Sequence, residues 1–288
     1  NLKKDVKRKT KMSKLLILAN NVDYGKDEFG EHFDRVDKHS LADVTIDSNT
    51  GETSNVLVDG TRIEEWGSLY IKPEPKAFNY TRVLLEILSN KDIDCNMDAS
   101  SIFILTKKPY LSQVLSSNGN SIPRQASVST EKGLTELTKD VEFPVVAKKY
   151  SDLQLKEAKV FEDFEELKTF AELTEHGRDF LMIQEYDKEK SCFDILYIDG
   201  KLIGLKAEGA VYEDSGEVSR SYYGISGEQE KIVKNAVESI GTGVCRVRLK
   251  GKKIMDMSTD PMLEMFKNES GKNVYGRVAD YLKTEENE

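Results

Sequence analysis

The chain has 288 residues, of which 38% are hydrophobic, so it can bury a sizeable core and we expect it to form two or three lobes. Its formal net charge of −9, with charged residues spread along both halves, argues against a nucleic-acid partner. The longest apolar runs, such as residues 15–19, are too short to cross a bilayer, and we find no signal-peptide core. These features predict a cytoplasmic protein with no membrane partner.

Cysteine and histidine give no sign of a metal site. Cys95, Cys192 and Cys245 lie far apart, without the spacing of a zinc site or the density of a disulfide scaffold, so we expect buried thiols. The three histidines also form no ligand pattern. Homo-oligomerisation is compatible with this sequence, but no residue pattern indicates it.

The first half of the chain alternates strand and helix patterns. Residues 1–11 are basic with almost nothing apolar, which predicts a flexible arm. The following elements are a buried strand, a hairpin that turns at Asp59-Gly60, a second buried strand and an amphipathic helix, expected at residues 15–19, 56–63, 67–73 and 79–88. This order is typical of an α/β lobe with a mostly parallel sheet.

The second half contains hairpin patterns, which predict antiparallel sheet. We expect helices at residues 109–119, 160–177, 228–241 and 272–284. We expect strands at residues 143–149, 180–186, 193–209 with a turn at Asp199-Gly200, 244–249 and 253–257. Two types of sheet in one chain favour separate lobes.

Several short tracts occur in an order that resembles the ATP-grasp superfamily, over about residues 15–283. They are Thr106-Lys107-Lys108, Gly119 to Pro123, Phe143 to Lys148, Ile183 to Tyr186, Phe193-Asp194-Ile195, Cys245 to Leu249 and Met255 to Pro261. Within the superfamily they are most similar to the group of ribosomal-protein glutamate ligase, glutathione synthase and D-alanine ligase. The resemblance implies a mixed α/β and α+β fold, in which a Rossmann-like lobe (12–105) precedes two α+β lobes (106–186 and 187–288) that enclose a nucleotide cleft.

The resemblance also implies which residues bind ATP. Lys148, at the end of an apolar run, would place one cation against the phosphates, although a lysine there could simply mark where the strand reaches solvent. Lys108 would be a second phosphate ligand, with Lys107 as the competing assignment. The adenine hinge would comprise Gln184, Glu185 and Tyr186, and Asp187 or Glu189 would accept hydrogen bonds from the ribose.

The positions that hold magnesium in the family are altered. Asp256 and Ser258 stand where the family has Glu-x-Asn, and Arg248 replaces the first acid. The resemblance implies Mg²⁺ as a cofactor, with Asp256 as the main remaining metal ligand and Ser258 or Asp260 assisting. Magnesium requires oxygen ligands, so the guanidinium of Arg248 would repel the ion, and it could itself pair with a phosphate or with Asp256. Arg220 occupies the region where the family often keeps a basic residue near the acyl phosphate.

A glycine-rich loop that covers the phosphates in the family is also missing. Residues 150–157 contain no glycine, although Lys156 could reach inward. Two interpretations follow from the resemblance. The chain is either a ligase that uses ATP to join a small-molecule or peptide carboxylate to an amine through an acyl phosphate, or a non-catalytic pseudoenzyme that binds a nucleotide or a protein. A chance resemblance in an unrelated α/β protein is the third interpretation.

Overall fold

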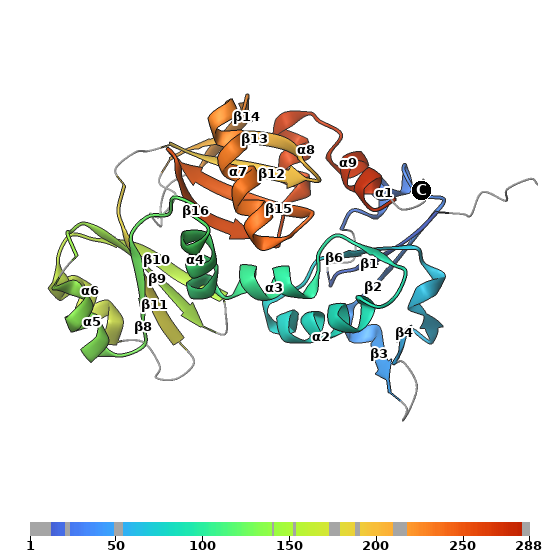
Figure 1. Cartoon of the computed structure of the whole chain (residues 1–288), viewed down its shortest axis with the longest axis horizontal. Helices are drawn as coiled ribbons and strands as arrows, with labels where there is room; N and C mark the ends of the chain where they lie inside the picture. Colours follow the sequence, from blue (N-terminus) through green and yellow to red (C-terminus); the bar gives the residue numbers. More distant parts are fainter. Residues whose placement is uncertain are drawn as a thin grey trace, which may run out of the picture.

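The computed structural model describes residues 13–20, 24–48, 54–139, 141–151, 154–172, 179–187, 191–209 and 218–283. The described residues form four β-sheets with helices packed on and between them (Figure 1). The predicted basic arm, 1–11, lies outside these ranges. No helix among the described residues has the length and apolar character to span a membrane.

The N-terminal sheet is parallel and has the strand order β2-β1-β6-β7. Its strands are β1 (Lys14–Leu18), β2 (Arg35–His39), β6 (Ser68–Ile71) and β7 (Asp94–Cys95). A small antiparallel sheet beside it contains β3 (Val44–Asp47), β4 (Asn55–Val58) and β5 (Thr61–Arg62). The apolar run of β1 is fully buried because helices and the C-terminal part of the chain cover both faces of this sheet.

The described part of the first 117 residues contains α1 (Lys26–Gly30), α2 (Phe78–Leu88), α3 (Ala99–Thr106) and α4 (Lys108–Ser117). Short 3-10 turns occur at Leu41–Asp43, Ile63–Glu65 and Pro75–Ala77. Helices α3 and α4 follow each other across Lys107 and run between the N-terminal and central sheets (Figure 1). Pro109 is tolerated in the first turn of α4 because the first amides of a helix lack intrahelical partners.

The central sheet is antiparallel and has the strand order β10-β9-β11-β8. Its strands are β8 (Gln125–Val128), β9 (Val145–Ser151), β10 (Gln154–Phe161) and β11 (Asp179–Glu185). One face packs on α5 (Glu131–Thr138) and α6 (Phe164–Glu172) through an apolar cluster. The opposite face is therefore available to face the rest of the molecule.

The C-terminal sheet is also antiparallel and has the order β14-β13-β12-β15-β16. Its strands are β12 (Ser191–Ile198), β13 (Lys201–Glu208), β14 (Ser219–Tyr223), β15 (Val244–Lys250) and β16 (Lys253–Ser258). Helix α7 (Gly227–Ile240) covers one face together with α3 and α4. The chain then ends in α8 (Leu263–Ser270) and α9 (Val274–Tyr281).

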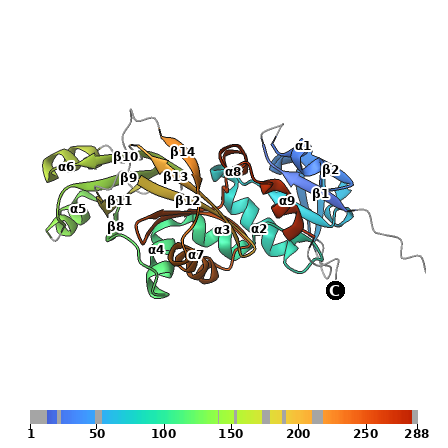
Figure 2. The same ribbon diagram turned by 90° about the horizontal axis from the view of Figure 1, so that it is seen from above.

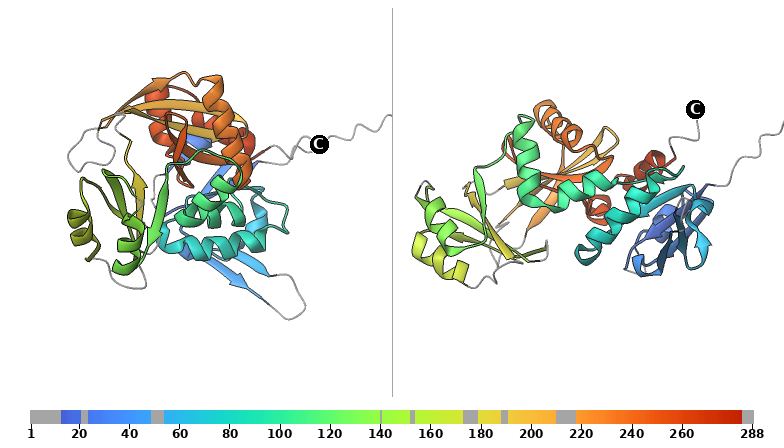
Figure 3. Two further views of the ribbon diagram at one scale, coloured as in Figure 1. Left: turned by 60° about the vertical axis from the view of Figure 1, so that its left-hand side comes forward. Right: turned by 60° about the horizontal axis from the view of Figure 1, so that its bottom comes forward.

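The two last helices join the C-terminal sheet to the N-terminal sheet. One apolar cluster contains Leu15 and Tyr70 of the N-terminal sheet, Leu196 of β12, Phe266 of α8 and Val278 of α9. Helices α8 and α9 lie beside α1 and β1 (Figure 2). The central sheet lies at the opposite end of the molecule from the N-terminal sheet (Figure 3).

The observed fold confirms the predicted mixture of parallel and antiparallel sheet and most predicted elements. The helix expected at residues 160–177 was placed wrongly at its start: Val160 and Phe161 belong to β10, and α6 begins at Phe164. The helix expected from residue 272 is α9, and α8 before it was not predicted. Cys192 and Cys245 are buried as expected, whereas Cys95 is only partly buried.

Candidate functional site

The candidate site lies where the central sheet faces α4 and the C-terminal sheet. Strand β9 alternates, so that Ala147 points to the helices α5 and α6 while Lys148 and Tyr150 point to the site. Lys148 is only 5% exposed, and its Nζ donates a hydrogen bond to Oε1 of Gln184 on β11 at 2.6 Å. The alternative that Lys148 marks the emergence of a strand into solvent is therefore wrong.

Burial changes the acidity of Lys148. Removing its ammonium from water lowers the pKa of Lys148 to about 8, and the charges of Lys108 and Arg248 act in the same direction. The carboxylate of Asp256 opposes this effect. Lys148 is thus a buried cation that an additional anion would stabilise.

Lys108 is the first residue of α4 and lies across the site from Lys148. Its Nζ donates to Oδ1 of Asp256 at 2.7 Å and to the carbonyl oxygen of Met257 at 2.6 Å. Burial opposes the ionisation of Asp256, but Lys108, Lys148 and Arg246 outweigh it, and the pKa of Asp256 is lowered. The structure therefore places an ammonium directly on the carboxylate that was predicted to bind magnesium.

Arg248 makes a different pair from the one expected. Its Nε and Nη2 donate to the two carboxylate oxygens of Asp194 on β12 at 2.8 and 3.1 Å, and Nε of Arg220 on β14 donates to the same carboxylate at 3.4 Å. Asp194 is fully buried. Arg248 is cross-strand from both Asp194 and Asp256 in the sheet, but its bidentate bond goes to Asp194.

The side-chain oxygens at the predicted metal position do not suit a magnesium ion as ligands. Ser258 accepts a hydrogen bond at its Oγ from the amide of Asp260 at 3.1 Å, and Asp256 is already paired with Lys108. Within the ranges given above, no three His, Cys, Asp or Glu side chains gather in a way that could hold a metal ion. Mg²⁺ needs several oxygen ligands, usually carboxylates, and the arginines of β15 repel it. We conclude that the residues at this position do not fit a magnesium ion.

The predicted adenine hinge lies at the end of β11. Gln184 is buried, Glu185 pairs with Lys253, and Lys250 donates to the carbonyl oxygen of Asp187. The ammonium of Lys250 also lies 5.5 Å from the ring centre of Tyr186. Strand β16 and the end of β15 thus hold the hinge through lysines. The alternative ribose ligand, Glu189, lies outside the described residues.

The segment that replaces the glycine-rich loop is a hairpin between β9 and β10. Residues 152–153, between the two strands in the sequence, lie outside the described ranges. Lys156 is exposed and donates to Gln154 at 2.6 Å, so it does not reach into the site. Tyr150 is buried against Phe180, with parallel rings 4.9 Å apart, and forms part of the wall.

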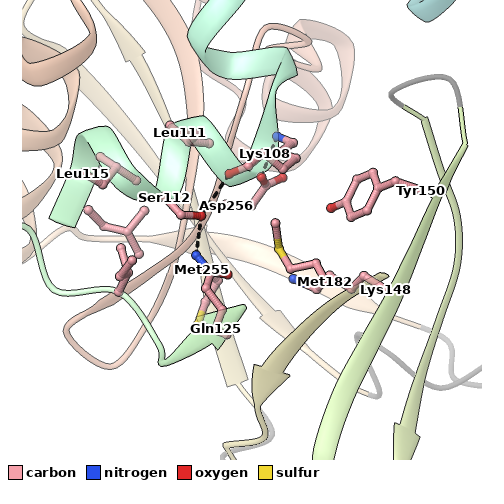
Figure 4. Close-up of a pocket in the computed structure, with 12 residues that line it drawn as sticks. Lys108, Leu111, Ser112, Leu115, Gln125, Lys148, Tyr150, Met182, Met255 and Asp256 are labelled. Carbon is pink, nitrogen blue, oxygen red and sulfur yellow. Dashed lines mark hydrogen bonds and ion pairs between the residues drawn. The ribbon is translucent and has the colours of Figure 1, made fainter. Parts of the chain in front are cut away.

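Side chains from both sheets fill most of the space between them. The cavity has a volume of about 20 Å³, and its walls include Lys108, Gln125, Lys148, Tyr150, Met182, Met255 and Asp256 (Figure 4). This volume holds about one water molecule. Gln125 bonds to Ser112 of α4, and Nε2 of Gln184 lies 3.8 Å from Sδ of Met255. A phosphate group can enter this cavity only if these contacts separate.

The sequence analysis assigned no role to two residues of this site. Asp194 is the counter-ion of Arg248, and the signal for it is a single acid within the otherwise apolar tract FDILYI. Arg246 is cross-strand from Ser258 and faces the same side as Arg248, as the alternation in VCRVRL indicates. Both residues carry charges that act on the other charged side chains of the site.

Comparison with known proteins identifies the fold. The ATP-grasp ligase PsnB complexed with a minimal precursor superposes with a TM-score of 0.73 at 12% identity, covering 96% of this chain and 99% of that one. A RimK-domain ATP-grasp protein from Sphaerobacter thermophilus gives 0.69 at 16% identity, covering 94% and 99%. D-alanine–D-alanine ligase from Bacillus anthracis, complexed with ATP, gives 0.66 at 14% identity, covering 94% and 95%. The chain has the ATP-grasp fold.

At the level of sequence, the chain is similar to a probable alpha-L-glutamate ligase from Psychromonas ingrahamii. The two are 29% identical over 182 residues, which cover 59% of this chain and 60% of that relative. No family model matches the chain. The sequence match therefore spans less than two thirds of the relative.

Proposed function

We propose that this chain is a nucleotide-binding module with an ATP-grasp cleft, in which Lys108 and Lys148 hold the phosphates of ATP. The observation that carries this proposal is the convergence of these two lysines on Asp256 from separate elements. A buried ammonium is stabilised by nearby anions, and a phosphate group would add its negative charge to that of Asp256 beside Lys148. Its hydrogen bond to Gln184 would then be exchanged for one to phosphate.

The rest of the nucleotide would extend toward the end of β11. In this proposal the adenine edge binds the main chain near Glu185 and Tyr186, and Asp187 accepts hydrogen bonds from the ribose. The proposal keeps the lobe boundaries expected from the sequence, 12–105, 106–186 and 187–288. Because the cavity is about 20 Å³, binding must separate the central sheet from β16 and α4. The bound state is therefore more open than the structure described above.

Calorimetric titration with ATP tests the proposal. Lys148→Met removes the charge with little change in shape, and we expect at least about tenfold weaker binding because a charge-assisted hydrogen bond is lost. Lys149→Met is the matched control, because the neighbouring side chain emerges on the opposite face of β9. Failure of the wild-type chain to bind ATP, or equal affinity in both variants, would contradict the assignment.

Ligase activity is the second candidate, and the relatives favour it. The sequence relative is named a probable glutamate ligase, and PsnB has been solved with its minimal precursor, Mg and ADP. In that case the γ-phosphoryl group of ATP would pass to a carboxylate, giving ADP and an acyl phosphate. An amine would then attack the acyl carbon and release inorganic phosphate. Arg220 and Arg248 would stabilise the phosphoryl oxygens, and stabilisation of charge would supply most of the rate.

The two candidates differ in turnover. A ligase would produce one ADP for each carboxylate–amine bond when the chain is incubated with ATP, glutamate and acceptor peptides, as mass spectrometry can measure. A binding module would retain ATP without producing ADP. We favour the module because the predicted metal carboxylate, Asp256, is already neutralised by Lys108.

A further inference from the structure

Four cations surround the place where the fold would hold a metal ion. This cation cluster consists of Lys108 on α4, Lys148 on β9, and Arg246 and Arg248 on β15. Arg246 is cross-strand from Ser258 and Arg248 from Asp256, so both arginines emerge on the face of the C-terminal sheet that carries Asp256. The cluster therefore includes both arginines that are cross-strand from the predicted metal ligands.

Two carboxylates among the residues that the structure describes pair with members of the cluster. Asp194 is engaged by both Arg248 and Arg220, and Asp256 is engaged by Lys108. Nη1 of Arg246 donates a hydrogen bond to the thioether sulfur of Met262 at 2.8 Å, and a thioether is a weak acceptor. Arg246 is only partly buried and can exchange that partner for a stronger one.

We infer that the cation cluster takes the place of magnesium, so that the cleft binds the polyphosphate of a metal-free nucleotide and Mg²⁺ weakens the binding. This inference rests on the proposed nucleotide function. A metal-free triphosphate carries more negative charge than its magnesium complex, and arginine pairs with phosphate oxygens through two parallel hydrogen bonds. A bound Mg²⁺ would face Arg246 and Arg248, and the nearby carboxylates of Asp194 and Asp256 already pair with cations.

The test compares the affinity of the full chain for ATP in EDTA with its affinity in excess Mg²⁺, by calorimetry. We expect binding in EDTA and at least about tenfold weaker binding with Mg²⁺. Inorganic tripolyphosphate in EDTA should compete with ATP, because the cluster recognises phosphates. Equal or tighter binding with Mg²⁺ would overturn the inference and leave the nucleotide proposal intact. Absence of ATP binding under both conditions would overturn both.

A variant tests whether the arginines are responsible. Arg246→Gln is preferable to a change of Arg248, because removing Arg248 would leave Asp194 buried without its main partner. We expect Arg246→Gln to weaken ATP binding in EDTA about tenfold and to reduce the inhibitory effect of Mg²⁺. Lys252→Gln is the control, because Lys252 lies exposed at the β15–β16 turn and pairs with Glu228. Equal affinities in the two variants would contradict a role for Arg246.

Discussion

Asp194 is the residue on which the buried charges of the C-terminal sheet depend. Its carboxylate is fully buried and accepts two hydrogen bonds from Arg248. Burial opposes its ionisation, but Arg248 outweighs burial, and the pKa of Asp194 is lowered. A lowered carboxyl pKa contributes stability above the ordinary pKa of an aspartate, and this stability is lost as the pH falls through the folded-state value.

Asp194→Asn should destabilise the protein, because it leaves the buried Arg248 without its counter-ion. We expect the free energy of unfolding at pH 7 to fall by about 3 kcal/mol, as measured by urea denaturation. The loss should become smaller below about pH 4, where the wild-type carboxylate is itself being protonated in the unfolded chain. If Asp194→Asn has the same free energy of unfolding as the wild-type protein, the ion pair contributes nothing to stability.

Lys148 should make nucleotide affinity dependent on pH. Since burial lowers the pKa of Lys148 to about 8, its ammonium is charged at pH 7 and is deprotonated as the pH rises. A phosphate prefers the charged form, so affinity for ATP should be constant near pH 7 and should fall as the pH rises above about 8. Calorimetric titrations between pH 7 and pH 10 measure this decrease.

Lys148→Arg provides the control for that pH dependence. A guanidinium stays protonated throughout this range, so the variant should bind ATP with an affinity that changes little with pH. If both proteins lose affinity in parallel, the titrating group is not Lys148.

The residues of the site were only partly predictable. Lys148 and Lys108 could be chosen as candidate phosphate ligands because each lies in a short sequence motif, such as the FPVV run before Lys148. The partners of the charged residues could not be found in this way, because the pairing of Arg248 with Asp194 depends on the order of β12 and β15 in the sheet. Strand order brings together residues that lie 54 positions apart.

At the scale of elements, helix α7 illustrates a local signal that fixes a boundary. The side chain of Ser226 accepts a hydrogen bond from the amide of Gln229, while Oε1 of Gln229 accepts one from the amide of Ser226. This reciprocal capping box satisfies amides that have no partner within the helix. The helix ends at Ile240, and the capping residue Gly241 has the left-handed conformation that glycine adopts readily.

Ser226→Ala should therefore destabilise the protein modestly. We expect a loss of about 1 kcal/mol in the free energy of unfolding, as measured by denaturant titration. Ser239→Ala on the same helix is the control, since its hydroxyl bonds to the carbonyl oxygen of Asn235 and to Asn120 rather than to an end of the helix. If Ser239→Ala lowers the free energy of unfolding more than Ser226→Ala does, the capping hydrogen bond is not the dominant contribution of these serines.

The elements that sequence patterns missed lack such signals. Helix α3 is apolar on nearly all sides because it packs between α2, α4 and the C-terminal sheet, so its sequence shows no clear amphipathic period. Strand β10 is mostly exposed and rich in lysine and glutamate, a composition that is depleted in strands. It forms because β9 supplies a partner along its length.

At the scale of the whole molecule, the first and last parts of the chain share one core. Phe266 of α8 is fully buried in the cluster that contains Leu15, Ile17 and Tyr70. The only tryptophan, Trp66, lies in the adjoining cluster on the other face of the same sheet. The N-terminal sheet should therefore not unfold independently of α8.

Phe266→Ala should lower the unfolding midpoint reported by Trp66 fluorescence. We expect a loss of about 3–5 kcal/mol from the cavity that the substitution creates. Leu134→Ala is the comparison, because Leu134 is equally buried but lies in the separate cluster beneath the central sheet. It should change the Trp66 midpoint much less. Equal effects of the two variants would show that the central and N-terminal sheets unfold together.

The central claim is that a nucleotide occupies the space between the central sheet and β16. Hydrogen–deuterium exchange in EDTA, with and without ATP, tests it most directly, because amides near a bound nucleotide gain partners and exchange more slowly. We expect ATP to protect β9, β11 and the first turn of α4, while α2 and α9 remain unchanged. Protection confined to other elements, or none with saturating ATP, would contradict the account.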